Sequence, residues 1–476
     1  MRSALIALSA RAVKSAQRHF GLVFLWEGKR TRRFGTPAGR ASEMCRRLPF
    51  LNEDIAFKYV FIHFCILTRE NHLLISNLMR NITGSPVERS DFFDRPGDLA
   101  RLRRELSNGA NLLLTAPRRV GKTSLVLRLC ELEREAGRSA VFMNVEGCHD
   151  ELAFAERLVD GLNESGLHPE MLSRVSLAFR KTRQAFRGMK MGAAGVDMEM
   201  GAAEDPDHST LGRALESIFR KIEVGGKSVL LAIDEMPELL LALGKDEHGA
   251  ERVSRLLHWL RALRQTYRQH VRWIFLGSIG LDSFVDDRNL RKTINDLTGL
   301  NLEALSTEEA DTFLCELGKG NGLPLAPEQR SFIIQRVGWP LPHHLQIVFH
   351  ALVDPGTTKA DAAAVDAAFE HLLLPNNLSQ FDTWRQRLDE QFGQSDATAA
   401  KDVLRHLCQH PAGRSRAQVL NALMTTRQSA DPAAVEDQIA RLLLMLQRDG
   451  YLLESAGSYA FRSFLLREYW HRREVR

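Results

Sequence analysis

The chain has 476 residues, of which 44% are hydrophobic and 26% charged, and its formal net charge is +5. This composition excludes wholesale disorder and is ordinary for a globular protein with room for two or three domains, and the small net charge does not by itself indicate a nucleic-acid partner. The six cysteines form no C-x-x-C pair, so neither a zinc knuckle nor a disulfide framework is indicated and a reducing, cytoplasmic location fits best.

Residues 1–84 are predicted to form an N-terminal extension outside the folded domains. Residues 1–40 are rich in arginine, contain Glu27 as their single acid, and superficially resemble an organellar transit peptide. Residues 1–78 lack the hydrophobic periodicity of the rest of the chain, so we expect that Met79 is the real start or that the preceding segment is disordered. Neither this region nor any other contains the roughly 18 uninterrupted apolar residues of a membrane span, so no membrane partner is predicted.

A phosphate-binding loop is the first motif of the predicted core. Residues 111–115 read as an apolar strand and residues 124–133 as a helix. The loop between them matches the pattern G-x-x-x-x-G-K-[ST] except at its first position, where Ala116 replaces glycine. Such a loop wraps backbone N–H groups around a triphosphate, and the helix adds the positive end of its dipole. The alternative is a basic surface turn. The candidate nucleotide-binding residues are Ala116, Pro117, Arg118, Arg119, Val120, Gly121, Lys122, Thr123 and Ser124.

Three residues of this loop have separate predicted roles. Gly121 would allow the backbone to approach the phosphates closely, and Lys122 would reach the β- and γ-phosphates. The hydroxyl of Thr123 would ligate Mg²⁺. We count Lys122 among the candidate catalytic residues as well.

The next segments are a strand and an insertion. Residues 140–145 form a short apolar run that predicts a second strand. Residues 188–200 alternate apolar and polar side chains around a glycine-rich turn, which predicts a β-hairpin inserted into the core.

An acidic pair follows the third predicted strand. Residues 228–233 are apolar, and Asp234 and Glu235 stand at the carboxyl end of this run. A buried parallel strand presents such acids at the edge of the sheet where ligands bind. Asp234 would hold the Mg²⁺ shell through water, and Glu235 would polarise the attacking water as the catalytic base. The alternative is a strand with a solvated end.

The fourth predicted strand, over residues 271–278, ends in Ser278. Its hydroxyl would contact the γ-phosphate or the attacking water, whereas the alternative is a simple turn. In the basic loop that follows, Arg288 and Arg291 are candidates for an arginine finger acting across a subunit interface. Because short apolar strands alternate with helical stretches, we predict an α/β fold with a parallel sheet covered on both faces.

Two smaller regions follow the sheet. Residues 302–395 are predicted to form a helical lid and linker, with a capping box from Ser306 to Glu309. Residues 396–476 resemble a winged helix, with helices at 398–410, 415–424 and 431–448 before two strands that form the wing. The third helix has a mixed face that is poor in phosphate-binding charge, so DNA binding and protein docking are both open.

The motifs together resemble those of the AAA+/STAND-type P-loop ATPases, particularly the archaeal-type ATPases. The resemblance rests on residues 118–125, 231–237 and 275–278, and on Gly338-Trp-Pro-Leu, which is similar to the Gly-x-Pro module of STAND proteins. It implies a P-loop NTPase parallel sheet (AAA+/STAND-like) over residues 85–301, followed by a helical lid and a winged-helix domain. It also implies ATP rather than GTP as the nucleotide, Mg²⁺ as the metal, and Pro340 lying against the adenine.

Two functions are compatible with these predictions. The first is an ATP-binding and ATP-hydrolysing molecular switch, which alternates between ATP and ADP and acts through its lid and winged helix on a protein partner, on a second copy of itself or on DNA. The second is a DNA-binding regulator or origin-type loader, in which ATP drives assembly with little turnover. We favour the first, and the sequence identifies no particular partner.

Overall fold

The computed structural model describes residues 79–87, 91–93, 95–165, 206–245, 247–277, 281–286, 288–353, 360–426 and 431–475. All of them lie in the second of the two units into which the chain divides, Asn77–Arg476. Residues 1–78, and with them most of the expected N-terminal extension, fall outside the described residues, as does the hairpin predicted near residues 188–200.

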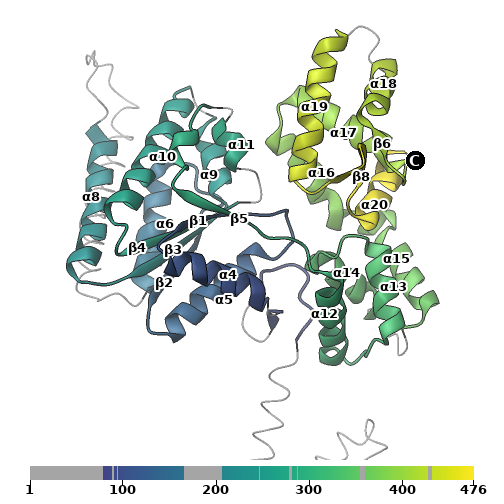
Figure 1. Cartoon of the computed structure of the whole chain (residues 1–476), viewed down its shortest axis with the longest axis horizontal. Coiled ribbons are helices and arrows are strands. Elements are labelled where there is room, and N and C mark those ends of the chain that lie inside the picture. The colour runs from purple at the N-terminus through teal and green to yellow at the C-terminus, as the bar shows by residue number, and fades with distance from the viewer. Residues whose placement is uncertain are drawn as a thin grey trace, which may run out of the picture. The chain divides into compact units, whose positions relative to one another are not determined.

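The structure contains a parallel sheet of five strands, which confirms the predicted α/β fold (Figure 1). Its strand order is β2-β3-β4-β1-β5. Strand β4 lies between the phosphate-loop strand β1 and the acidic strand β3, so these two are next-nearest neighbours whose carboxyl ends meet at one edge of the sheet. The strands are β1 (Asn111–Thr115), β2 (Ser139–Asn144), β3 (Val229–Asp234), β4 (Val271–Gly277) and β5 (Leu297–Asn301).

Strand β5 is the one strand of this sheet that was not predicted. It pairs with β1 at the edge of the sheet, and of its five residues only Leu300 is buried. A half-exposed edge strand that contains glycine lacks the continuous apolar run by which a buried parallel strand is recognised.

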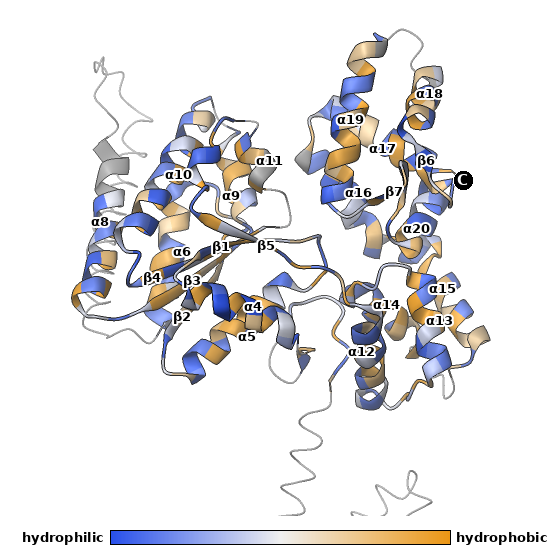
Figure 2. Cartoon of the chain, viewed as in Figure 1, coloured by the Kyte–Doolittle hydropathy of each residue, from blue (hydrophilic) through white to orange (hydrophobic). Residues whose placement is uncertain are grey.

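Each face of the sheet carries its own hydrophobic core. Leu112 and Leu114 of β1 pack on one side with residues of α4 and α5, whereas Leu113 packs on the other side with residues of α6, α8, α9 and α10. This split follows from the period of two along a strand, and Figure 2 shows apolar segments of these helices turned toward the strands. The helices are α4 (Pro96–Ser107), α5 (Lys122–Glu135), α6 (Glu151–Glu164), α8 (Pro206–Val224), α9 (Met236–Leu243), α10 (Gly249–Thr266) and α11 (Leu281–Asp286), with a 3-10 turn at Arg291–Thr293.

A group of four helices follows the sheet. The predicted capping box at the start of α12 is present, because the Ser306 hydroxyl accepts a hydrogen bond from the Glu309 N–H at 3.1 Å while the Glu309 carboxylate accepts one from the Ser306 N–H at 2.8 Å. Helix α13 ends at Gly338, whose φ of 76° is left-handed. The helices are α12 (Thr307–Gly320), α13 (Pro327–Val337), α14 (Pro342–Val353) and α15 (Ala362–Leu372).

The C-terminal part has the element order of a winged helix. Helices α17, α18 and α19 precede the antiparallel hairpin of β7 and β8, and β6 between the first two helices pairs with β8. The flanking helices α16 and α20 were not predicted. None of the described helices is both long and apolar enough to cross a membrane. The elements are 3-10 turn Pro375–Asn377, α16 (Ser379–Gln391), α17 (Gln394–Cys408), β6 (Arg414–Ser415), α18 (Arg416–Thr426), α19 (Pro432–Arg448), β7 (Leu452–Ser455), β8 (Ser458–Phe461) and α20 (Phe464–Glu474).

Candidate nucleotide site

The predicted phosphate loop connects the end of β1 to the start of α5. Gly121 caps α5 in a left-handed conformation with φ 96°, which glycine adopts without steric cost. Arg119 is also left-handed, with φ 69°. Ala116 does not have a positive φ, so its methyl group causes no backbone strain at the position where the pattern has glycine. Val120 is fully buried and anchors the loop in the core below it.

Arg95 supports the loop from the core side. Its guanidinium donates to the carbonyl of Val120 at 3.3 Å and to that of Glu303 at 2.8 Å, and it forms an ion pair with Asp98 at 2.8 Å. These bonds connect α4, the phosphate loop and the segment after β5. Arg95 therefore positions the loop, and nothing in its contacts requires a direct role toward a nucleotide.

The Lys122 side chain lies back over the loop. It is only 6% exposed, and its Nζ donates to the carbonyl of Ala116 at 3.1 Å. Burial lowers the pKa of Lys122 to about 8; the carboxylates of Glu235 and Asp234 oppose this shift, whereas Arg387 and Arg118 reinforce it. A buried ammonium at the N-terminus of a helix is suited to an anion of high charge.

Thr123 and Asp234 meet although they are far apart in the sequence. The Thr123 hydroxyl donates to Asp234 Oδ2 at 2.6 Å, and Asp234 Oδ1 accepts from the Glu235 N–H at 2.9 Å. Asp234 is buried, so its charge acts in a poorly solvated environment. A hydroxyl and a carboxylate at one point are the hard oxygen ligands that Mg²⁺ prefers, and the residues present fit that metal.

Glu235 turns the chain from β3 into α9. Its backbone is left-handed, with φ 58° and ψ 36°, which is uncommon for a residue other than glycine and is typical of functional sites. Burial raises the pKa of its carboxyl group, and the neighbouring charge of Asp234 raises it further. Both effects make Glu235 a better proton acceptor than an exposed glutamate.

The remaining predicted residues have different surroundings. β4 ends at Gly277 beside Thr115 of β1, and Ser278 lies outside the described residues. Arg288 covers the ring of Phe284, with 3.9 Å between the guanidinium carbon and the ring centroid. Arg291 is exposed and pairs with Asp286 at 2.8 Å. The predicted finger role of these two arginines stays a prediction.

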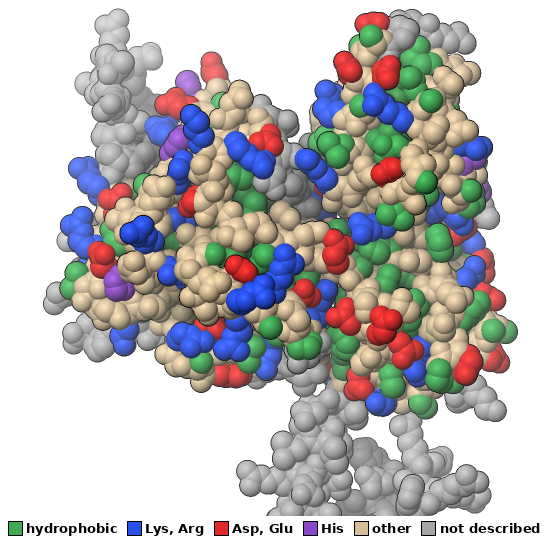
Figure 3. All heavy atoms as spheres, in the orientation of Figure 1, with side chains coloured by type: hydrophobic (Ala, Val, Ile, Leu, Met, Phe, Trp, Pro, Cys, Tyr) green, Lys and Arg blue, Asp and Glu red, His purple; other side chains and the backbone are tan. Residues whose placement is uncertain are grey.

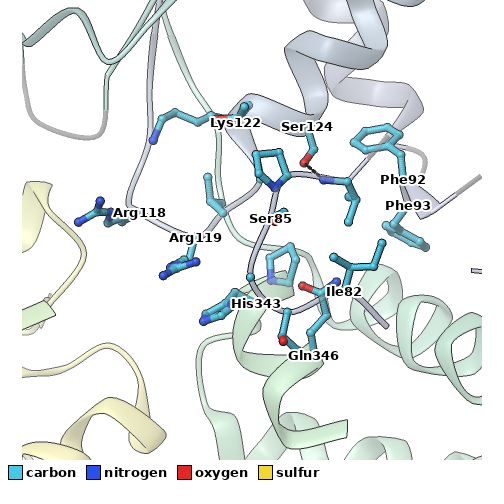
Figure 4. Close-up of a pocket in the computed structure, with 18 of the residues that line it drawn as sticks. Ile82, Ser85, Phe92, Phe93, Arg118, Arg119, Lys122, Ser124, His343 and Gln346 are labelled. Atoms are coloured by element: carbon cyan, nitrogen blue, oxygen red, sulfur yellow. Dashed lines mark hydrogen bonds between the residues drawn. The ribbon is translucent and has the colours of Figure 1, made fainter. Parts of the chain in front are cut away.

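A cavity of about 410 Å³ extends from the loop toward the helical group (Figure 4). Residues 118–124 of the phosphate loop line it, together with Asp234 and Glu235, whereas Ala116 and Pro117 do not. Pro340 is not among the lining residues either. The helical group contributes Phe313 of α12 and, from the first turns of α14, Pro342, His343 and Gln346.

The far wall of this cavity was not predicted from the sequence. Residues 82–87 cross the mouth of the loop, and the N–H of Val87 donates to the hydroxyl of Ser124 at 3.0 Å. His343 faces this segment and Arg119, and burial lowers its pKa to about 3, so its ring is neutral. These residues carry no motif, and only the packing of the helical group against the segment brings them together.

The fold and the geometry of the loop and acidic strand define a P-loop NTPase architecture of the AAA+-like kind, with helical and winged-helix parts after the sheet. This fold is found in the structure of a Walker-type ATPase from Pyrococcus abyssi, which matches with a TM-score of 0.55 at 15% identity over 84% of this chain and 99% of that one. The resemblance to archaeal-type ATPases is thereby confirmed at the level of the fold.

Further solved structures match less closely. The ORC2 protein of Aeropyrum pernix has a TM-score of 0.48 at 13% identity, with 82% of this chain and 96% of that chain covered. Cdc6p of Pyrobaculum aerophilum has a TM-score of 0.36 at 10% identity, with 81% and 97% covered. No protein-family model and no curated protein matches the sequence.

Proposed function

We propose that the chain is a Mg²⁺-dependent ATPase that works as a molecular switch. The observation that carries this proposal is the hydrogen bond of 2.6 Å between Thr123 and Asp234, with Lys122 and Glu235 beside it. The hydroxyl and carboxylate that would bind the metal, the ammonium that would bind the phosphates and the candidate catalytic base lie around one point, and this supports phosphoryl transfer to water.

Each of these residues has one task in the proposed reaction. Thr123 Oγ1 and the Asp234 carboxylate would hold Mg²⁺, which supplies charge neutralisation at the phosphates when it is bound. Lys122 would leave the carbonyl of Ala116 and donate to the phosphates instead. The Glu235 carboxylate would orient the attacking water and accept its proton, a role for which its raised pKa suits it. Ser278 would contact the γ-phosphate from the neighbouring strand.

We propose that the nucleobase of the bound nucleotide is adenine. The cavity beyond the phosphate loop is lined by Phe92, Phe93, His343 and Gln346, so a base would meet both apolar rings and polar atoms there. We infer that the lid, about residues 302–395, and the winged helix, about residues 396–476, change position with the nucleotide and present a different surface to a protein partner or a second copy.

Thermal melting with nucleotides tests this proposal. A ligand at a hundred times its dissociation constant stabilises a protein by about 2.7 kcal/mol, so Mg²⁺ with ATP is expected to raise the melting temperature clearly, and GTP much less. The Lys122→Ala variant is expected to lose the ATP shift. Wild-type protein that shows no shift and releases no nucleotide on denaturation would contradict the proposal.

DNA is the less favoured partner because basic side chains of the second and third helices of the winged helix form ion pairs with acidic side chains. Arg441 of α19 forms an ion pair with Asp396 at 3.2 Å, and Arg416 of α18 forms one with Glu436 at 3.1 Å. Figure 3 shows acidic and basic side chains interspersed over the visible face of these elements. A DNA-reading helix needs unpaired positive charge for the phosphates.

We therefore expect weak DNA binding with little salt dependence. Affinity for a duplex is to be measured at about 50 and 200 mM salt, since 6–10 phosphate contacts would cost roughly 10³–10⁵ in affinity over that range. A steep fall would favour the DNA-bound loader over the protein-directed switch.

A further inference from the structure

Gln346 is a buried glutamine that lines the nucleotide cavity. Only 9% of the residue is exposed, and it lies near the start of α14. Within the part of the chain that the structure describes, its side-chain amide has no hydrogen-bond partner, and the bond that Asn81 makes to this residue goes to its backbone carbonyl. Buried polar groups are nearly always paired, and an amide offers both a donor and an acceptor. The side chain of Gln346 is therefore open to a molecule bound in the cavity.

The position of Gln346 is set by the segment that crosses the phosphate loop. The side-chain amide of Asn81 donates to the Gln346 carbonyl at 3.1 Å, and the Asn81 N–H donates to Oδ1 of Asn321 at 3.3 Å. The same segment donates a backbone N–H to the hydroxyl of Ser124 at 3.0 Å. Residues 79–87 thus connect both α12 and α14 to the phosphate loop, and this gives Gln346 a defined place relative to the phosphates.

Gln346 lies at the end of the cavity where a nucleobase would be. Figure 4 shows Gln346 and Lys122 at opposite ends of the group of cavity-lining side chains. A nucleotide whose phosphates contact Lys122 would therefore extend its base away from the loop, toward α14. Ile82, Phe92 and Phe93 line the same cavity and suit the two faces of a flat aromatic ring. Such apolar walls accept any base, so a choice between bases needs a polar group at the ring edge.

The chemistry of an amide fits one edge of adenine. Adenine carries an acceptor at N7 and an amino donor at N6, and a glutamine side chain can bond both at once. Guanine carries acceptors at both N7 and O6, so the same amide can satisfy only one of them with its NH₂ group while its oxygen is left without a donor. A buried glutamine at this edge therefore favours adenine over guanine.

We propose that Gln346 is a specificity-determining residue, which recognises the adenine of ATP through N6 and N7. This inference rests on the proposed ATPase function. Oε1 of Gln346 accepts a hydrogen bond from the N6 amino group, and Nε2 donates one to N7. The phosphate loop holds the triphosphate of any nucleotide, and α14 supplies the preference for ATP over GTP.

The first test uses wild-type protein with Mg²⁺ and compares ATP with 7-deaza-ATP, in which a C–H group replaces N7. This analogue leaves the Nε2 donor of Gln346 buried and unpaired, so it should bind at least about fivefold more weakly than ATP. GTP should bind roughly fivefold to 150-fold more weakly than ATP, the range that a bidentate pair gives against the wrong base. Equilibrium dissociation constants measured on one preparation give both ratios.

The second test repeats these measurements on Gln346→Met, since methionine has a similar length but neither donates nor accepts at the base edge. ATP should weaken by at least about fivefold, GTP should weaken less, and ATP and 7-deaza-ATP should agree within about twofold. The matched control is Gln335→Met. Gln335 lies exposed in α13 of the same helical group and does not line this cavity, so the wild-type ratios should be kept.

The outcomes separate this inference from the proposed function. Equal affinity of wild type for ATP and 7-deaza-ATP would overturn the role of Gln346 and leave the ATPase function in place, and this comparison needs no variant that folds. A preference for ATP over 7-deaza-ATP that is as large in Gln346→Met as in wild type would overturn it too, because another group would then contact N7. Wild-type protein that binds no triphosphate would overturn the proposed function as well.

Discussion

The Glu235→Gln variant is expected to bind ATP as tightly as wild type and to hydrolyse it about 10²–10⁴-fold more slowly, the usual contribution of a positioned general base. Glutamine has the same length and can keep the left-handed backbone and the start of α9, so the fold is preserved. What it loses is the carboxylate that accepts a proton. Single-turnover hydrolysis and equilibrium binding of ATP, measured on the same preparation, check the two halves of this expectation.

The control for this variant is Glu238→Gln. Glu238 lies one turn further along α9, and burial raises the pKa of its carboxyl group as it does for Glu235. Glu238 does not line the cavity beside the phosphate loop, so the Glu238→Gln variant should change turnover by less than about twofold. In wild type, turnover should fall as the pH drops through the pKa of Glu235, which lies above its ordinary value of 4.5, and this acid limb should be absent from the residual activity of Glu235→Gln. Equal turnover by wild type and Glu235→Gln would remove Glu235 from the role of base.

The parts of the site that were predicted are those that a short piece of chain determines. Gly121 is required by its own backbone angle, Thr123 belongs to a contiguous loop motif, and Glu235 directly follows a strand that is continuously buried. Such features are visible in a window of a few residues. The predicted sheet is confirmed for the same reason, because β1, β2, β3 and β4 are buried and read as apolar runs.

The parts that were missed depend on contacts between distant segments. His343 and Gln346 face the cavity because α14 packs beside residues 82–87, and Gly450 lies against Pro117 because the C-terminal part packs beside the loop. No local spacing encodes these contacts. Strand β5 was missed for a different reason, since half-exposed edge strands lack the apolar pattern of central ones.

In the absence of nucleotide, the Lys122→Met variant is expected to have a larger free energy of unfolding than wild type. Burial lowers the pKa of Lys122 from 10.5 to about 8, which means that the folded state disfavours the charged ammonium. By linkage this shift costs up to about 3 kcal/mol of folding free energy at pH 7. Methionine fills a similar volume without a charge and removes that cost.

The stability difference between Lys122→Met and wild type is expected to change with pH in a definite direction. Between the folded pKa of about 8 and the unfolded value of 10.5 the unfolded chain holds more protons at this lysine, so the stability of wild type rises with pH across that window. The advantage in melting temperature of Lys122→Met should therefore be full below pH 8 and fade toward pH 10.5. A Lys245→Met control, at an exposed lysine, should show no such trend. With Mg²⁺ and ATP present the order should reverse, because only wild type gains the binding energy. A Lys122→Met protein that melts below wild type at pH 7 without nucleotide would contradict this account, in which the buried ammonium destabilises the fold and is there to bind phosphate.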